Sequence, residues 1–339
     1  MVLRVKPARP GPLRILDDRD RDEVLGICDR EPVTNVFVGA RVHAVGLNPA
    51  RLGAQIWGHY SAGRLRSLCY AGANLVPVAA TPEAITAFAD RARSQGRRCS
   101  SLVGPAKDVS ALWSLLEPHW GPPRDVRATQ PVLAMTGPPT CAPDPLVRRV
   151  RPDELNVLMP ACVAMFTEEV GISPMAGDGG ATYRARVSEL IRAGRAFARI
   201  ENGRVLFKAE IGSVTPHACQ VQGVWVDPAR RGEGLASAGM ASVVREAQRS
   251  IASIVSLYVN DFNAPARAAY RRVGFAQVDT FMSVLFERCA GPGGRPPGTP
   301  RMRSAPRGGT SPTHRPLTGP EARFAGPVSR GRGSAAGGQ

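Results

Sequence analysis

The sequence lacks the residue patterns that hold a structural metal or a disulfide scaffold. Its 339 residues include seven cysteines and five histidines. The cysteines are odd in number and scattered, and they form neither a Cys-x-x-Cys pair nor a cluster with histidine at zinc-ligand spacing. We therefore expect a protein without a metal cofactor and without a disulfide framework.

Long apolar segments are also missing. No apolar run approaches the roughly 18 residues of a membrane-spanning helix. The first part of the chain interrupts its apolar stretches with Arg, Lys and Pro before the core of a signal peptide develops. We therefore expect a cytoplasmic, soluble protein that has no membrane partner.

Lysine is scarce although the chain is strongly basic. The formal net charge is +16, and of 44 basic residues only Lys6, Lys107 and Lys208 are lysines. Residues 290–339 hold eight arginines, 12 Gly and 9 Pro but one acid and few large apolar side chains. This composition predicts a disordered tail. Because no aromatic residue except Phe324 is interleaved with its arginines, we do not expect a nucleic-acid partner.

The rest of the sequence reads as two folded units, as its length suggests. A first domain spans residues 1–136 and a second spans residues 148–289. The linker between them, residues 137–147, contains four prolines. Each unit shows the order helix, antiparallel strands, strand–helix, strand–helix and strand. This order predicts an α/β (α+β) fold in which helices flank a mixed, mainly antiparallel sheet.

A glycine-rich turn in the second unit has the pattern of an anion site. Residues 221–236 read VQGVWVDPARRGEGLA, a strand followed by a turn with two glycines and then a helix. Backbone N–H groups converge where such a turn enters a helix, and they bind anions. Gly232 and Gly234 would let the main chain approach a pyrophosphate that a Cβ would hold away. Taken alone, the turn is also typical of an ordinary strand–helix connection.

A second motif follows over residues 257–275, which read LYVNDFNAPARAAYRRVGF. In it Asn263 opens a predicted helix, Tyr270 follows seven residues later, and Gly274-Phe275 leads into a last strand. This motif resembles the signature of the GNAT superfamily of N-acetyltransferases. The preceding glycine turn resembles that family's pyrophosphate loop, Q/R-x-x-G-x-G/A. The two motifs together are much more specific than either alone.

One position departs from the loop pattern, because Ala229 stands where the family usually has Gln or Arg. Such loops bind phosphate mainly through main-chain N–H groups, and Arg230 and Arg231 keep positive charge beside them. We therefore expect the loop to retain its ligand. Glu233, between the two glycines, is expected to point to solvent.

The resemblance implies a catalytic GNAT domain over residues 148–289 with acetyl-CoA as its co-substrate. By position, the backbone of Val224 and Val226 would pair with the pantetheine arm, and one N–H would face the thioester oxygen. Asn263 would contact the cofactor, although it also suits a plain helix N-cap. The full set expected at the cofactor is Val224, Trp225, Val226, Arg231, Gly232, Glu233, Gly234, Leu235, Ala236 and Asn263.

The same resemblance implies that Tyr270 is the general acid that protonates the departing CoA thiolate, although a tyrosine at helical spacing is otherwise often a packing residue. The general base is open. Some relatives have a Glu on the strand before the signature Asn, but here residues 256–260 contain no acid. Glu168, Glu169 and Glu210 are the candidates, and a water relay is the alternative.

The first unit resembles a poorly characterised domain that precedes GNAT domains in some high-GC bacterial acetyltransferases. Its element order suggests a degenerate GNAT-like copy, so that the chain carries two such folds in tandem. The matching junction, residues 74–83, reads NLVPVAATPE and has no glycine loop. We therefore expect no CoA there. The unit would cover the acceptor side of the active domain or mediate self-association as a homodimer.

The implied function is acetyl-CoA-dependent N-acetyl transfer, in which a primary amine of a small molecule or a protein attacks the thioester directly. Two alternatives stay open. A non-catalytic CoA-binding or scaffold protein would explain the missing obvious base. Tandem GNAT folds also occur in aminoacyl or peptidyl transferases, which do not need the CoA loop.

Overall fold

A computed structural model describes residues 12–176 and 178–287. The predicted disordered tail, residues 290–339, lies outside the described residues. The elements of the first half are β1 (Leu13–Ile15), α1 (Arg21–Cys28), α2 (Val36–Val45), α3 (Pro49–Leu52), β2 (Gln55–Ser61), β3 (Arg64–Ala71), β4 (Asn74–Val78), α4 (Pro82–Gln95), β5 (Ser101–Pro105), α5 (Ala106–Trp120) and β6 (Asp125–Met135). Those of the second half are β7 (Arg148–Arg149), α6 (Leu155–Val170), α7 (Ala181–Arg192), β8 (Ala196–Glu201), β9 (Arg204–Val214), β10 (Ala218–Val226), α8 (Leu235–Ser250), β11 (Ile254–Tyr258), α9 (Ala264–Val273) and β12 (Ala276–Leu285).

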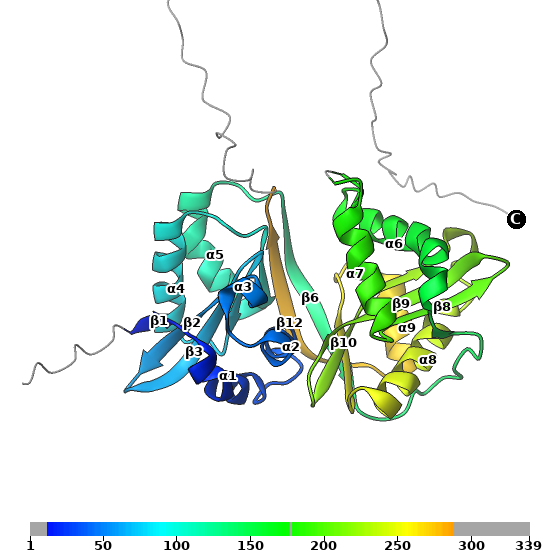
Figure 1. Ribbon diagram of the computed structural model, residues 1–339, viewed down its shortest axis with the longest axis horizontal. Helices are drawn as coiled ribbons and strands as arrows, with labels where there is room; N and C mark the ends of the chain where they lie inside the picture. Colours follow the sequence, from blue (N-terminus) through cyan, green and yellow to red (C-terminus); the bar gives the residue numbers. More distant parts are fainter. Residues whose placement is uncertain (1–11, 177, 288–339) are drawn as a thin grey trace, which may run out of the picture. The chain divides into compact units, whose positions relative to one another are not determined.

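The strands form one continuous sheet in the order β1-β2-β3-β4-β5-β12-β6-β11-β10-β9-β8-β7. Among the described residues only two neighbouring pairs, β4–β5 and β10–β11, run parallel. The remaining neighbours are antiparallel, and helices pack against the strands of both halves (Figure 1). The predicted α/β fold with a mixed, mainly antiparallel sheet flanked by helices is therefore confirmed.

The two halves exchange their last strands. β6, the last strand of the first half, pairs with β11 of the second half, whereas β12 pairs with β5 of the first. β6 and β12 also pair with each other, and Figure 1 shows them side by side at the centre of the sheet. Met282 and Val284 of β12 consequently lie in the core of the first half, and Leu133 and Met135 of β6 lie in the core of the second. The break in the sequence at residues 137–147 is thus not a break in the sheet.

Local sequence explains how the helices nearest the site begin. α9 starts at Asn263, whose side chain accepts a hydrogen bond from the N–H of Ala266 at 3.2 Å. α8 starts at Gly234 without a side-chain cap. Along α8 the residues Met240, Val243 and Ala247 are fully buried, as their helical spacing predicts. In the part of the chain that the structure describes, no helix combines the length and the apolar character needed to cross a membrane.

Candidate active site

The glycine turn between β10 and α8 has the geometry of an open anion site. After β10 the chain makes a short 3-10 turn, Pro228–Arg230, which Asp227 caps by accepting a hydrogen bond from the N–H of Ala229 at 3.1 Å. Gly232 and Gly234 then adopt φ values of +88° and +83°. A Cβ at either glycine would meet no atom within 4 Å, so the left-handed backbone, and not lack of space, selects glycine here. The main chain of the turn is left uncovered.

The N-terminus of α8 offers free donors to that turn. The N–H groups of Ser237 and Ala238 both donate to the carbonyl of Gly234 at 3.1 Å. The N–H groups of Glu233, Leu235 and Ala236 have no backbone acceptor among the described residues. Unpaired N–H groups at the positive end of a helix of this length favour an anionic ligand.

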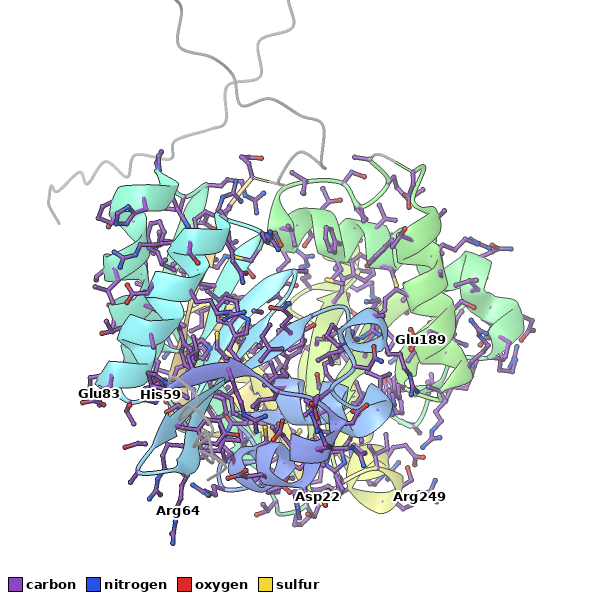
Figure 2. The ribbon with its side chains drawn as sticks, turned by 60° about the vertical axis from the view of Figure 1, so that its left-hand side comes forward. Asp22, His59, Arg64, Glu83, Glu189 and Arg249 are labelled. Carbon is purple, nitrogen blue, oxygen red and sulfur yellow. The ribbon has the colours of Figure 1, made fainter. Side chains whose placement is uncertain are left out.

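The matching helix of the first half is closed to an anion. α4 begins at Thr81, whose side chain accepts a hydrogen bond from the N–H of Ala84 at 3.3 Å. Glu83 adds a carboxylate to the first turn, and the pKa of this group is lowered mainly by its own backbone N–H and by Thr81. Figure 2 shows Glu83 next to His59, which also contributes to lowering that pKa. A carboxylate and a capped helix end leave no phosphate site there.

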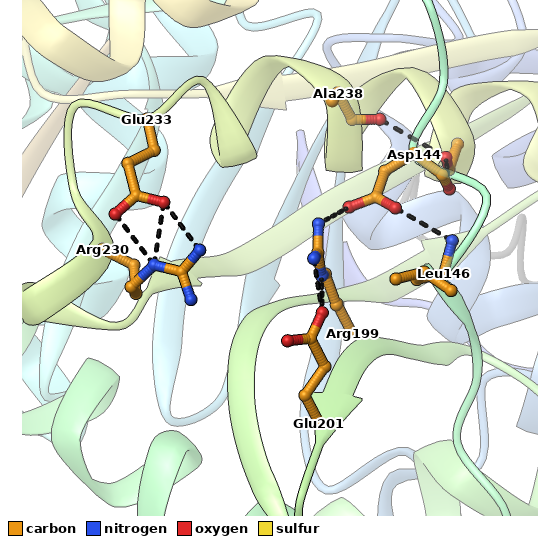
Figure 3. A network of polar contacts seen from close by, with 8 residues as sticks. Asp144, Leu146, Arg199, Glu201, Arg230, Glu233 and Ala238 are labelled. Carbon is orange, nitrogen blue, oxygen red and sulfur yellow. Dashed lines mark hydrogen bonds and ion pairs between the residues drawn. The ribbon is translucent and has the colours of Figure 1, made fainter.

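Carboxylates engage both arginines of the glycine turn. Arg230 forms an ion pair with Glu233 at 2.7 Å, drawn in Figure 3, and this pair lowers the pKa of Glu233. Arg231 donates to Glu168 at 2.7 Å, and the indole of Trp225 donates to the other oxygen of Glu168 at 3.3 Å. The positive charge expected beside the loop is therefore present but paired. Glu168 belongs to this link between α6 and the loop.

A second polar network supports α8 from the connection between the halves. Asp144 is buried, and its carboxylate accepts from Arg199 of β8 at 2.9 Å and from the N–H of Leu146 at the same distance (Figure 3). The N–H of Asp144 in turn donates to the carbonyl of Ala238 in α8 at 3.0 Å. Asp144 of the predicted linker thus contacts α8, the helix that follows the glycine turn, and helps to fix it.

β10 leaves one edge free on its way to the turn. It pairs with β11 only from Ala218 to Gln220. Against β9 its register shifts between Gln222 and Trp225, which places one extra residue in β10 and makes a β-bulge. Gly223 in this bulge has φ +59°. The backbone of Val224 therefore lies where an extended ligand can pair with a strand edge, whereas the carbonyl of Val226 accepts a hydrogen bond from Arg231 at 3.2 Å.

Glu210 lies below this bulge in a buried ion pair. Its carboxylate accepts a hydrogen bond from Lys208 at 2.6 Å and one from the thiol of Cys162 in α6 at 3.6 Å. Lys208 is 0% and Glu210 is 5% exposed. Lys208 is not among the site residues predicted from the sequence. The available signal was two opposite charges two positions apart in a strand that is otherwise apolar.

Glu169, near the end of α6, is an exposed base candidate whose pKa the surrounding protein raises. Desolvation by the surrounding protein raises the pKa of Glu169, although part of its side chain reaches solvent. The positive charges of Arg127 and Lys208 lower this pKa, and the negative charge of Glu210 raises it. The guanidinium of Arg127, from the exchanged strand β6, donates to the backbone carbonyl of Glu169 at 2.7 Å. The first half of the chain thus contributes to this position.

Tyr270 of α9 is 6% exposed and packs edge-on against Phe275 at 6.0 Å between ring centroids. Burial raises the pKa of its phenol, and the negative charge of Glu169 adds to the rise. The structure therefore brings Tyr270 and Glu169 within electrostatic range of each other although they are about a hundred positions apart in the sequence. Tyr258 of β11 shares this environment: it is 38% exposed, and desolvation by the surrounding protein and the same carboxylate raise its pKa.

Pocket size does not locate this site. One pocket of about 400 Å³ lies in the first half between Trp57, Trp120 and Arg98. A smaller one of about 190 Å³ lies beside Arg267 and Arg271 of α9. Neither contains a carboxylate or the glycine turn. Among the described residues no group of His, Cys, Asp and Glu is arranged to hold a metal ion.

A known family model covers the part of the chain that contains the glycine turn. Residues 179–275 match the family model described as Acetyltransferase (GNAT) family. Residues 54–158 match the model described as Domain of unknown function (DUF4081). No curated protein matches the chain in sequence.

Two of the following solved structures share the fold at low sequence identity. A GCN5-related N-acetyltransferase from Sphaerobacter thermophilus is 16% identical, with a TM-score of 0.52 over 81% of this chain and 95% of that one. A Drosophila protein is 14% identical, with a TM-score of 0.56 over 82% and 99%. A tandem GNAT protein from the clavulanic acid biosynthesis pathway is 16% identical, with a TM-score of 0.49 over 80% and 98%.

Proposed function

We propose that the chain is an acetyl-CoA-dependent N-acetyltransferase that acts on a primary amine, because residues 179–275 match the GNAT acetyltransferase family model and residues 54–158 match the DUF4081 model before it. The observation that carries this proposal is the anion site at the start of α8. The free N–H groups of Leu235 and Ala236 and the uncovered turn at Gly232 fit a pyrophosphate. Thr81 and Glu83 close the counterpart of this site at the start of α4 in the first half.

Bound acetyl-CoA would supply an activated acetyl group as a thioester. The free edge of β10 at Val224 and Val226 would pair with the pantetheine arm and lead the thioester toward the bulge. A backbone N–H of Val224 would donate to the thioester oxygen, on which negative charge develops as the amine attacks. Asn263 caps α9 through its side-chain oxygen, so its amide nitrogen is available to the cofactor.

Glu169 is the strongest of the three base candidates. Glu168 is committed to Arg231 and Trp225, and Glu210 is buried with Lys208. The raised pKa of Glu169 makes it a better proton acceptor than an ordinary glutamate while part of its side chain remains accessible. We propose that it takes the proton that the amine loses as the carbon–nitrogen bond forms, directly or through one water.

Tyr270 would donate its proton to the sulfur as the carbon–sulfur bond breaks. An ordinary phenol has a pKa of about 10 and a thiol one of about 8.5, so this transfer is uphill. The raised pKa of Tyr270 increases that cost but also keeps the phenol protonated at neutral pH. After the transfer, the proton taken up by Glu169 balances the proton that Tyr270 gave up, and solvent exchange restores both groups.

The test begins with calorimetric titration of the full chain with acetyl-CoA, for which we expect one site per chain. Mass spectrometry then follows acetyl transfer to a panel of primary amines, both free and within peptides. An acetylated amine together with released CoA supports the proposal. Acetyl-CoA binding without transfer to any amine would favour a CoA-binding scaffold. Failure to bind acetyl-CoA, with transfer from aminoacyl-tRNA instead, would favour a peptidyl transferase.

A further inference from the structure

Burial of the Lys208–Glu210 pair costs free energy, so the presence of the pair needs an explanation. The ammonium and the carboxylate are 2.6 Å apart, and their side chains are 1% and 7% exposed. Removing two charges from water costs several kcal/mol per ion, and a well-packed apolar pair in the same place is often as stable or more so. Stability alone therefore does not explain why strand β9 carries two charges at its centre.

The position of the pair relative to the β10 bulge supplies a reason. Glu210 is paired with Gln222 and Lys208 with Trp225, so the two charges lie opposite the two ends of the bulge. A Cβ built on Gly223 would lie 3.2 Å from Nζ of Lys208 and 3.4 Å from Cδ of Glu210. The polar ends of both side chains therefore pack directly against the main chain of the bulge.

The Lys208 side chain carries its charge in this position. Burial acts to lower its pKa, but Glu210 and Cys162 together raise it by more, so the pKa is raised overall. An ammonium a few ångströms from a peptide group favours negative charge at that peptide's N–H, and it does so more strongly away from water. Glu210 balances this charge while the site is empty of substrate. The pair thus fixes both the backbone geometry of the bulge and the electric field that acts on it.

We propose that Lys208 and Glu210 are positioning residues that hold the Gly223 bulge so that the following peptide N–H, that of Val224, meets the thioester oxygen. This inference rests on the proposed acetyl transfer. Neither side chain touches the substrate; both act through the main chain of β10. The pair should therefore affect the chemical step more than cofactor binding, because the pyrophosphate is held at a different place, the start of α8.

The decisive variant replaces both charges by apolar groups of similar size, Lys208→Met with Glu210→Leu. Because the double change leaves no unpaired buried charge, its melting temperature should stay near that of the parent. We expect kcat for CoA release with the identified amine to fall by about 10-fold or more, while KM for acetyl-CoA changes less than about 2-fold. The pH midpoint of the rate should stay close to that of the parent, because the double change removes two opposing effects on the pKa of Glu169.

A matched control and a second variant make the result specific. Glu154→Gln also removes a buried carboxylate held by an arginine, Arg148 at 2.7 Å, but at the β7 edge of the sheet, and it should leave kcat unchanged. Gly223→Ala pushes the bulge away from the pair, because the new Cβ would contact Met165 at 3.0 Å as well as both charges. It should lower kcat as the double variant does, and it serves as the test if the double variant does not fold.

The outcomes separate this inference from the function on which it rests. A parent protein that transfers no acetyl group to any amine refutes the proposed function. An active parent whose double variant keeps the parental kcat overturns the positioning role. An equal loss of kcat in Glu154→Gln overturns it as well, because the loss would then follow from general destabilisation. Disappearance of the rise of the rate with pH in Glu210→Gln would make Glu210 the base instead.

Discussion

Arg231 of the glycine turn donates to Glu168 of α6 at 2.7 Å, and this ion pair joins the proposed phosphate site to the helix that carries Glu169. Both side chains are about half exposed, at 50% and 47%. An anion bound at the turn would compete with Glu168 for the same guanidinium. We therefore propose that the pair tunes cofactor affinity and takes no part in the chemical step.

This relationship predicts the effect of Glu168→Gln. Removing the carboxylate charge frees Arg231 for the pyrophosphate, so acetyl-CoA should bind about 2- to 5-fold more tightly, in line with the roughly 0.2–1 kcal/mol of an exposed ion pair. Turnover should change less than about 2-fold. Calorimetry gives the affinity and a CoA-release assay gives the turnover. A loss of turnover of about 10²-fold would instead identify Glu168 as the base.

Gly232→Asp should abolish binding of acetyl-CoA. It places a non-glycine residue at φ +88° and a negative charge where the phosphate would lie. The matched control is Gly203→Asp in the β8–β9 turn, where φ is +74° and the space around the Cβ is also open. Both variants should lose about 1 kcal/mol of stability from backbone strain, but only Gly232→Asp should lose binding. Unchanged acetyl-CoA titration of Gly232→Asp would remove the turn from the cofactor site.

Glu169→Gln should lower turnover by about 10²-fold or more without weakening acetyl-CoA binding. The carboxylate works as a base only when it is deprotonated, so the parental rate should rise with pH through the pKa of Glu169. Because crowding raises that pKa, the midpoint should lie above the ordinary value of about 4.3. The measurement is kcat/KM against pH for both proteins. A variant that keeps the parental rate and pH profile would leave the base to water or to another group.

Local sequence predicted the secondary-structure elements of the site well, but it predicted less well which elements lie next to one another. The glycine turn, the Asn263 cap and the helix that follows the turn depend on neighbouring residues, and the structure has each of them. The exchange of β6 and β12 was not predicted, because alternation in a strand shows which face is buried but not which strand lies beside it. The family resemblance located Tyr270, whereas no local pattern placed Glu169 near it.

Two further features were missed for physical reasons. Helix α2, residues Val36–Val45, contains four valines and a glycine, which favour a strand or a break by propensity. Burial of Val38 and Val42 overrides that preference, and Gly39 allows a close contact with Thr215 of the second half. The buried state of Lys208 was missed because lysine is almost never fully buried unless it is paired, and its pairing depends on the register of β9 and β10.

The ion pair between Glu154 and Arg148 predicts how the free energy of unfolding depends on pH. Arg148 and the N–H of Arg151 donate to this carboxylate and lower its pKa from 4.5 to about 2. A lowered pKa stabilises the fold above about pH 4.5, and this contribution is lost as the pH falls from 4.5 toward 2. Since Arg148 is 43% exposed, we expect about 1–2 kcal/mol after screening. Urea unfolding should show Glu154→Gln less stable than the parent at pH 7 and nearly equal to it near pH 2; an equal difference at both values would contradict the assignment.

The last prediction separates chemistry from packing at Tyr270. Tyr270→Phe keeps the ring against Phe275 and removes only the hydroxyl, so the melting temperature and acetyl-CoA affinity should change little. If the hydroxyl protonates the departing sulfur, kcat under saturating acetyl-CoA should fall by about 10²-fold. Tyr258→Phe is the control, because the charge of Glu169 also raises the pKa of Tyr258, but Tyr258 belongs to β11, is 38% exposed and has no assigned role in proton transfer. A Tyr270→Phe variant with parental kcat, or an equal fall in Tyr258→Phe, would show that the sulfur takes its proton from water or from the substrate.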